Sequence, residues 1–268
     1  MEPLTHASLN LPVVSVFDQG TEPRPWSVQV KDQIRKRYSD LAENGFRPGG
    51  DQRALQAGYS KKKIETQPHE LVLAYSGCGD PLEELDLSEF ESVVDLGCGA
   101  GLDIALLAQS CAADTLIIGL DFTFSMLKKA RGHKNNDRLK NNIKLILGDM
   151  EQLPIASNSI DLVTGNASFN LTLDKKLAFS EAARILRPGS KLVIRDLVRE
   201  GELPSELQQD PSAWNTSLGG VMEEQDLRDT VSAAGFEQIS ISHHRAFPPV
   251  IAIRLEARKP IQTKRSYL

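Results

Sequence analysis

The sequence has few cysteines, no long apolar run and no excess of basic residues. Its three cysteines, Cys78, Cys98 and Cys111, do not make the even set of a disulfide-bonded secreted domain, so we expect reduced thiols. The longest apolar stretches, such as residues 115–120, are too short to cross a bilayer. The N-terminus lacks the apolar segment of a signal peptide. These absences predict a cytoplasmic protein that does not enter a membrane.

The charge balance and the apolar content indicate a folded globular protein. The chain of 268 residues has 31 Lys and Arg against 36 Asp and Glu, a formal net charge of −5, which argues against binding nucleic acid through bulk charge. Hydrophobic residues make up 40%, which excludes a disordered chain. No Ser–His–Asp order and no clustered Cys and His spacing indicates a hydrolase or a zinc site. His243 and His244 are neighbours on a predicted strand and point to opposite faces, so we expect no metal site there.

The pattern of the chain changes near residue 91. From there short apolar strands alternate with helices, which predicts a parallel sheet covered on both faces. The first four strands are expected near residues 92–96, 115–120, 143–146 and 160–164, the fifth at 191–194, and an antiparallel pair at 238–242 and 250–257. The chain thus divides into an N-terminal tail or arm (1–29), a helical cap over the active site (30–90), an α/β core (91–200), an insertion on the substrate side (201–224) and a C-terminal helix, hairpin and tail (225–268).

A glycine-rich turn follows the first predicted strand. Gly97, Gly99 and Gly101 allow close approach of the backbone to a ligand. The dinucleotide fingerprint fails, because its third glycine is absent in either register. The carboxylate of Asp95, two residues before the turn, would repel a pyrophosphate but suits a cation. S-adenosylmethionine has no phosphate and carries an ammonium and a sulfonium, so the electrostatics favour this cofactor.

Two further carboxylates follow the second and third predicted strands. Asp121 stands where an acid accepts hydrogen bonds from both ribose hydroxyls of a nucleoside. Asp149 is placed to accept a hydrogen bond from the adenine amino group, and the apolar Phe122 and Met150 are placed to sandwich the ring. Either acid alone is equally typical of a helix cap. Together, at the ends of three successive strands, the acids predict a nucleoside site.

With these motifs the chain resembles the class I S-adenosylmethionine-dependent methyltransferases over roughly residues 30–258, and residues 181–193 look like that superfamily's helix and turn before the fifth strand. The resemblance implies an α/β, Rossmann-like fold with a mostly parallel seven-stranded sheet, an antiparallel final strand and an N-terminal helical cap. It implies S-adenosylmethionine as the cofactor. The cofactor-binding residues expected on this basis are Tyr38, Gly77, Asp95, Gly97, Cys98, Gly99, Gly101, Asp121, Phe122, Asp149, Met150 and Asn166.

Four stretches resemble the arsenite methyltransferase family more narrowly. They are the helix with Tyr38 and the segments 58–60, 76–81 and 210–214. In that family the region before the glycine turn lies over the cofactor, and cysteine thiolates bind the trivalent metalloid. Of the three thiol positions that the family uses, this sequence keeps Cys78.

The other two thiol positions are occupied by Ala167 and Ser217. A single thiol cannot hold a three-coordinate arsenic, and Cys98 and Cys111 are not placed to substitute. We therefore expect a related scaffold whose metalloid pocket has become roomier and less nucleophilic. The substrate-binding residues expected from this resemblance are Tyr59, Cys78, Ala167, Asn170, Trp214 and Ser217.

These observations predict a methyltransferase that acts by in-line displacement on a small organic acceptor, at a nitrogen, oxygen or carbon, plausibly in specialised metabolism. A general base is needed only if the acceptor stays protonated until attack, and Tyr59, Asn170 and Asp196 are the candidates. One alternative is an arsenite or thiol methyltransferase that uses Cys78 and external thiols. Another is a paralogue that binds the cofactor without catalysis. We expect a monomer or homodimer, with no metal and no nucleic acid partner.

Overall fold

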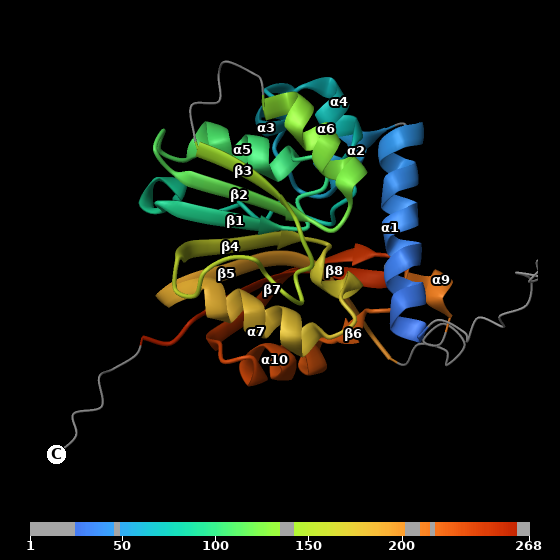
Figure 1. Ribbon diagram of the computed structural model, residues 1–268, viewed down its shortest axis with the longest axis vertical. Coiled ribbons are helices and arrows are strands. Elements are labelled where there is room, and N and C mark those ends of the chain that lie inside the picture. Colours follow the sequence, from blue (N-terminus) through green and yellow to red (C-terminus); the bar gives the residue numbers. More distant parts are fainter. Residues whose placement is uncertain (1–24, 46–48, 135–141, 202–209, 215–217, 262–268) are drawn as a thin grey trace, which may run out of the picture.

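The computed structural model describes residues 25–45, 49–134, 142–201, 210–214 and 218–261. A single twisted sheet forms its centre, and helices cover both faces (Figure 1). The strands are β1 (Ser92–Leu96), β2 (Leu116–Asp121), β3 (Asn142–Leu147), β4 (Ile160–Asn166), β5 (Leu186–Arg199), β6 (Met222–Glu223), β7 (Glu237–Phe247) and β8 (Val250–Arg258).

The strand order is β3-β2-β1-β4-β5-β8-β7. Strands β1 to β5 pair in parallel, whereas β8 is antiparallel to both β5 and β7. This confirms the predicted Rossmann-like fold with a mostly parallel sheet and an antiparallel final strand. The described sheet has eight strands rather than the expected seven, because the two-residue β6 pairs with the end of β5.

The order in which successive strands are added to the sheet reverses between β1 and β4. Because β2 and β3 extend to one side of β1 while β4 and β5 extend to the other, the loops after β1 and β4 diverge. The carboxyl ends of these two strands lie side by side, with Leu96 opposite Gly165. In open α/β sheets this divergence leaves a crevice where ligands bind. The topology therefore places the predicted cofactor loop at the expected edge.

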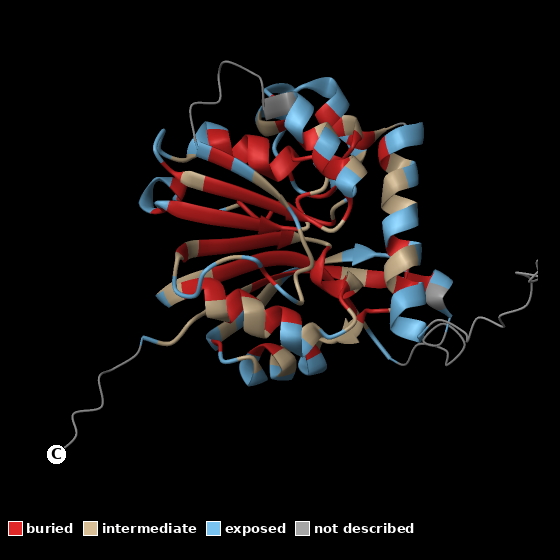
Figure 2. Cartoon of the chain, viewed as in Figure 1, coloured by how far each residue is buried: buried red, intermediate tan, exposed pale blue. Residues whose placement is uncertain are grey.

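The described helices are α1 (Trp26–Asn44), α2 (Gly50–Gln56), α3 (Lys61–Glu65), α4 (His69–Leu73), α5 (Leu102–Ser110), α6 (Phe124–Lys134), α7 (Lys175–Ile185), α9 (Pro211–Trp214) and α10 (Glu224–Ala233), with short 3-10 turns at Leu87–Glu89 and Phe169–Leu171. Helices α2 to α6 cover one face of the sheet, and α7 and α10 cover the other. Successive residues of β1 alternate between the two cores, Val93 on one side and Val94 on the other. Figure 2 shows the buried strands between the half-exposed helices.

Helix α1 lies across the edge of the sheet at which the parallel strands end (Figure 1). It begins at Trp26, so the predicted boundary of the cap at residue 30 is four residues late; the rest of the predicted tail lies outside the described residues. Its buried residues Val30 and Ile34 are four positions apart and therefore lie on one face of the helix. The helix packs against α6 and α9. It therefore covers the crevice.

Strand β5 is much longer than the predicted 191–194. The turn expected near Pro188 and Gly189 forms part of the strand. Proline cannot donate a hydrogen bond, but its neighbours compensate: the Gly189 amide donates to the Lys259 carbonyl over 2.8 Å, and the Lys259 amide donates to the Ser190 carbonyl over 2.9 Å. Pairing with the chain just after β8 thus extends the strand, an interaction between distant segments that local patterning does not encode.

No helix in the part of the chain that the structure describes is both long enough and apolar enough to span a bilayer.

Substituting Phe179 tests the core between the sheet and α7. Its ring is 0% exposed and stacks on Phe169 with the ring centroids 4.5 Å apart. We expect Phe179→Ala to lower the free energy of unfolding by about 3–5 kcal/mol, because a buried ring is lost and a cavity remains. Leu177→Ala on the same helix removes a side chain that is 44% exposed and should cost less than about 1 kcal/mol. Urea unfolding followed by circular dichroism measures both, and equal losses would contradict this packing.

Candidate functional site

The glycine turn after β1 requires its glycines. Gly97, Gly99 and Gly101 have φ values of +78°, +53° and +93°, in the left-handed region that residues with a Cβ rarely adopt. A Cβ on Gly97 would lie 2.4 Å from the Cβ of Ser168. The turn therefore holds its backbone closely against the loop after β4, as the sequence predicted for a ligand-binding turn.

Asp121, at the end of β2, fastens this turn. Its Oδ2 accepts a hydrogen bond from the Gly99 amide at 2.8 Å, and its Oδ1 accepts one from the Thr123 amide at 2.8 Å. The carboxylate is nearly buried, and burial raises its pKa. Asp121 also lines a cavity at the carboxyl ends of β1, β2 and β4.

This first cavity contains about 760 Å³ of space that atoms do not fill. It brings together most of the residues predicted to bind the cofactor. Those that line it are Tyr38, Gly97, Gly99, Asp121, Phe122, Asp149, Met150 and Asn166. They come from α1 and from the loops after four different strands, so the fold gathers what the sequence separates.

Helix α1 is tied to the rim of the first cavity by ion pairs. The Lys31 Nζ lies 2.7 Å from Asp149 Oδ2 and 2.6 Å from Glu151 Oε2. One turn further on, the Arg35 guanidinium lies 4.2 Å from the centroid of the Phe122 ring. Asp149, predicted as the adenine contact, is thus paired with a cation of the cap in this structure.

A second, smaller cavity continues from the first beneath the glycine turn. It shares Gly97, Gly99, Ser76 and Asn166 with the first cavity. The remaining predicted cofactor residues that line it are Gly77, Cys98 and Gly101. The two cavities together form an elongated space along the turn.

Asp103 lines the second cavity and was missed by the sequence analysis. It stands in the first turn of α5, where an acid is typical of ordinary helix stabilisation, so its position carried no distinctive signal. Asp103 is buried, and burial raises its pKa to about 6. A buried carboxylate at a cavity wall favours a cationic ligand.

Asp95, by contrast, lines neither of these two cavities. It is buried below the turn, where the Thr164 hydroxyl donates a hydrogen bond to its Oδ1 at 3.2 Å, and burial raises its pKa. The structure therefore offers Asp103, rather than Asp95, as the carboxylate that faces a cation in the second cavity. Direct ligand contact by Asp95 is not favoured by this geometry.

The side chain of Asn166 joins the end of β4 to the turn that precedes the core. Its Oδ1 accepts hydrogen bonds from the amides of Cys78 at 2.8 Å and Gly79 at 3.3 Å, and its Nδ2 donates to the Gly79 carbonyl at 2.7 Å. A Cβ on Gly77 would lie 2.4 Å from the Asn166 side chain. Asn166 and Gly77 thus form one tight junction, which we call the Asn166 clamp.

Tyr59 supports this junction from below. Its hydroxyl donates a hydrogen bond to Asp103 Oδ1 at 2.5 Å and accepts one from Asn166 Nδ2 at 2.9 Å. The residue is buried, and burial together with the Asp103 charge raises the pKa of its phenol well above the usual value. Tyr59 lines none of the cavities described here, so the geometry does not favour its predicted role as a base or substrate contact.

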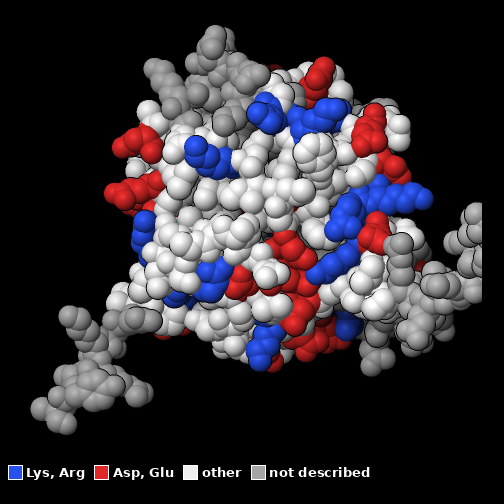
Figure 3. All heavy atoms as spheres, viewed as in Figure 1, with Lys and Arg blue, Asp and Glu red and all other residues white. Residues whose placement is uncertain are grey.

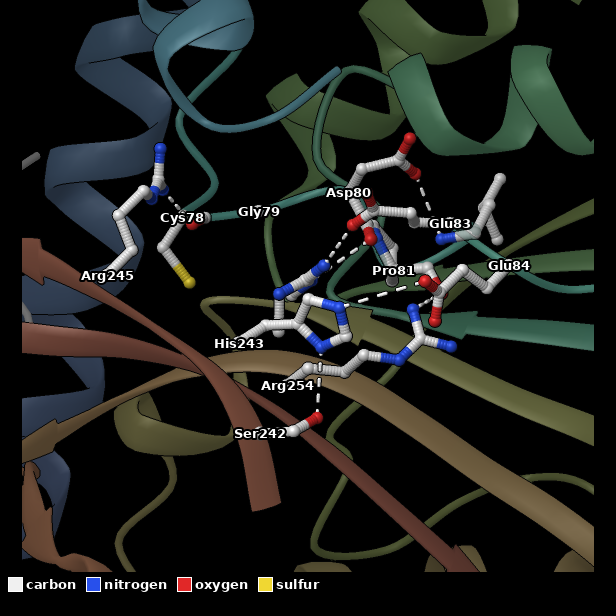
Figure 4. A network of polar contacts seen from close by, with 12 residues as sticks. Cys78, Gly79, Asp80, Pro81, Glu83, Glu84, Ser242, His243, Arg245 and Arg254 are labelled. Carbon is white, nitrogen blue, oxygen red and sulfur yellow. Dashed lines mark hydrogen bonds and ion pairs between the residues drawn. The ribbon is translucent and has the colours of Figure 1, made fainter. Parts of the chain in front are cut away.

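Basic side chains anchor the same turn from the other side (Figure 4). Arg245 of β7 donates a hydrogen bond to the Cys78 carbonyl, and Arg195 of β5 donates one to the Asp80 carbonyl at 3.0 Å. Lys63 Nζ lies 2.5 Å from Asp80 Oδ2. The turn is therefore attached to the cap, to β4 and to the C-terminal strands at once.

The two adjacent histidines engage different segments. His243 Nε2 lies 3.9 Å from a carboxylate oxygen of Glu84, and its Nδ1 lies 3.0 Å from the Ser242 hydroxyl (Figure 4). His244 Nε2 lies 2.6 Å from a carboxylate oxygen of Glu224. The imidazoles thus contact different segments, although the strand is irregular here: its register shifts between Ser242 and Arg245, and His243 has a φ of +53°.

A third cavity adjoins the first at Tyr38, Ser76 and Ala167, which line both. It is larger than the first two, with about 1610 Å³ of space that atoms do not fill, part of it open to solvent. Its walls come from α1, α2, the turn at 75–78 and the tip of the β7–β8 hairpin. It lies beside the first two cavities, which the predicted cofactor residues line and which we call the cofactor-type cavities. We call this third one the acceptor cavity.

Two of the predicted substrate residues, Cys78 and Ala167, line the acceptor cavity. Cys78 is the one thiol among the described residues of this wall, and burial raises the pKa of that thiol well above its usual value. Cys98 lies at the glycine turn, and Cys111 follows α5. The structure gathers no thiol set around Cys78 within the residues that it describes.

The other predicted substrate and base residues lie elsewhere. Asp196 accepts hydrogen bonds from the amides of Leu197 at 2.8 Å and Asn170 at 3.1 Å, and burial raises its pKa to about 6. With Asn170 it lines a small separate pocket. Trp214 packs edge-on against Trp26 with ring centroids 5.7 Å apart, so it buttresses α1. Ser217 lies outside the described residues.

Comparison with known proteins agrees with this architecture. Residues 87–235 match a family model described as a methyltransferase domain. An arsenite methyltransferase of Halobacterium salinarum is 30% identical over 233 residues, which cover 80% of this chain and 59% of that protein. The chain therefore spans about three fifths of the length of this curated relative.

Solved structures share the fold. An arsenic(III) S-adenosylmethionine methyltransferase from Chlamydomonas reinhardtii, CrArsM, superposes with a TM-score of 0.67 at 24% identity, over 75% of this chain and 73% of its own. The [4+2]-cyclase SpnF superposes with a TM-score of 0.60 at 17% identity, over 89% of this chain and 97% of its own. The strand order, the glycine turn and the match over more than half of the chain lead to one conclusion: the protein belongs to the methyltransferase-domain family, with the Rossmann-like fold of the class I S-adenosylmethionine-dependent enzymes.

Proposed function

We propose that this protein transfers a methyl group from S-adenosylmethionine to a small organic acceptor, at a nitrogen, oxygen or carbon atom, in specialised metabolism. The observation that carries the proposal is the pair of adjoining cavities: an acid-lined space along the glycine turn opens, at Tyr38, Ser76 and Ala167, into an acceptor cavity with one thiol.

The residues along the glycine turn fit the proposed cofactor. The carboxylate of Asp121 suits the ribose hydroxyls, and Phe122 and Met150 suit the faces of an adenine ring. Asp149 suits the adenine amino group once its ion pair with Lys31 is broken. The buried carboxylate of Asp103 suits the ammonium group, since ionisation in a buried site is favoured by a nearby cation.

The cofactor supplies an activated methyl group on a sulfonium, so the chain's own task is chiefly to orient and to exclude water. Tyr38, Ser76 and Ala167 stand where the two cavities meet, and helix α1 covers that junction. No Asp, Glu or His is found among the described residues that line the acceptor cavity. We therefore infer an acceptor whose own electron pair makes the in-line attack, without a carboxylate or imidazole base from this wall.

Two other functions remain as candidates. The arsenite methyltransferases among the relatives favour methylation of a metalloid or thiol, with Cys78 and external thiols. Against this, trivalent arsenic takes thiolate ligands, and burial holds the Cys78 thiol in its protonated form. The second candidate is a protein that binds the cofactor without catalysing methyl transfer, since the same fold also occurs in a [4+2]-cyclase.

The remaining partner predictions rest on the sequence. On the face in Figure 3, Asp and Glu gather near the lower centre and Lys and Arg are scattered around them, so the described residues of this face form no continuous basic surface for nucleic acid. That no nucleic acid binds, that the protein is a monomer or homodimer and that it is cytoplasmic all stay predictions.

Titration with S-adenosylhomocysteine tests the cofactor site. We expect Asp121→Ala to weaken binding by about 10- to 100-fold, the equivalent of losing charge-assisted hydrogen bonds. Asp114→Ala, a substitution of an exposed acid before β2, should leave the affinity unchanged. Isothermal titration calorimetry measures both variants beside the unaltered protein. Equal affinities for the two variants would remove the ribose role of Asp121.

The pH dependence of the same binding tests Asp103. Its carboxyl has a pKa of about 6, so it is neutral below that pH and cannot pair with the ligand's ammonium, whereas above that pH it is ionised. The affinity for S-adenosylhomocysteine should therefore rise between pH 5 and pH 7. Asp103→Asn should bind weakly and lose this rise, while Asp95→Asn should retain it. A rise that survives in Asp103→Asn would assign the dependence to another group.

Incubation with arsenite tests the metalloid alternative. With S-adenosylmethionine and glutathione present, we expect no arsenite-dependent formation of S-adenosylhomocysteine and no methylated arsenic by mass spectrometry, because Cys78 is the single thiol among the described residues that line its cavity. Methylarsenic products that disappear in Cys78→Ser, with cofactor affinity retained, would establish the alternative in place of the organic acceptor.

A further inference from the structure

The wall of the acceptor cavity carries three arginines and, among its described residues, no carboxylate. Arg37 comes from α1, Arg53 from α2 and Arg245 from β7. The neighbouring cavity has the opposite character, since Asp121 and Asp149 line it. Three cations from segments far apart in sequence thus converge on the space beside the cofactor-type cavity.

The hydrogen bond that Arg245 makes leaves its positive charge in place. Arg245 donates to the carbonyl oxygen of Cys78 (Figure 4), and Arg53 donates to the carbonyls of Leu73 at 3.4 Å and Tyr75 at 3.5 Å. These acceptors are neutral. A guanidinium has five N–H donors, so one bond to a carbonyl leaves donors for a ligand. Within the described part of the chain, neither Arg37 nor Arg245 forms an ion pair with a carboxylate.

The rest of the wall is largely apolar. Tyr38 and Leu41 of α1 face this space together with Ala57, Leu197 and Phe247. The ring of Phe247, at the hairpin tip, is 41% exposed and adds apolar surface to this wall. The enclosed part of the cavity, about 630 Å³, lies within the roughly 300–1,000 Å³ of pockets that hold drug-sized molecules, so it has room for more than a small metalloid complex.

We propose that the methyl acceptor is an extended apolar molecule with an anionic group, which the Arg37 and Arg245 guanidinium groups bind while the apolar wall holds its body. This deepens the proposed function and rests on it, since the cavity matters as an acceptor site only beside a bound cofactor. The opposite charges of the two cavities also favour different ligands. The acidic first cavity favours the cationic cofactor, and the basic acceptor cavity favours the anionic acceptor.

A pair of fluorescent probes tests this inference in protein saturated with S-adenosylhomocysteine. Anilinonaphthalene sulfonate is an apolar anion, and N-phenylnaphthylamine is the same aromatic skeleton without the sulfonate. We expect the anion to bind at least about tenfold more tightly than the neutral probe, as charge-assisted hydrogen bonds to guanidinium imply. Equal affinities for the two probes would overturn the inference.

Two neighbouring charge reversals on α1 provide the matched variants. Arg37→Glu alters the cavity wall, whereas Lys36→Glu makes the same net change at an exposed position of the same helix. Arg37→Glu should weaken the anionic probe about tenfold or more relative to Lys36→Glu and leave the neutral probe within about twofold. Equal effects of the two variants, or an equal loss for both probes, would contradict the proposed anion site.

A titration of each variant with S-adenosylhomocysteine keeps the two proposals separate. Neither Arg37 nor Lys36 lines the cofactor-type cavities, so both variants should bind this ligand as the unaltered protein does. Absence of that binding in all three proteins would overturn the proposed function. Intact binding without a preference for the anionic probe would overturn the inference about the acceptor alone.

Discussion

The Asn166 clamp is the contact on which the arrangement of the site depends. One amide side chain at the end of β4 satisfies the backbone of the turn at Cys78 and Gly79, and the same amide contacts Tyr59 and Asp103. Because the clamp is partly buried and its donors and acceptors are matched, leaving one of them unpaired would be costly. It fixes the cap against the parallel sheet and so sets the boundary between the two larger cavities.

Charge divides the space on either side of that boundary. The carboxylates of Asp121 and Asp149 come from strand ends, whereas Arg37 and Arg245 come from the cap and the C-terminal hairpin. Each set lies in a partly water-excluded wall, where a charge interacts more strongly than it would in bulk water.

Sequence patterns predicted the sheet and the cofactor side well because both are local: a strand, a glycine turn and an acid follow one another in the chain, as at Asp121. Asp103 was missed because an acid in the first turn of a helix has an ordinary explanation. Tyr59 was assigned to the substrate, but its burial against Asp103 depends on contacts between distant segments. The convergence of Arg37 and Arg245 has the same origin, since more than two hundred positions separate them and no periodicity links the cap to the hairpin.

The acceptor cavity is assembled mainly outside the segment that matches the methyltransferase-domain family, residues 87–235. Of its walls, Ala167 and Leu197 fall within that segment, while the cap and the hairpin tip supply the rest. The part of the chain that would hold the cofactor and the part that would hold the acceptor can therefore change at different rates. Exchanges in the cap and the hairpin would redirect the enzyme to another molecule without disturbing the glycine turn. The similarity to arsenite methyltransferases extends over both parts, since the match covers 80% of this chain, and a chimaera that exchanges only the cap and the hairpin would carry acceptor choice with it.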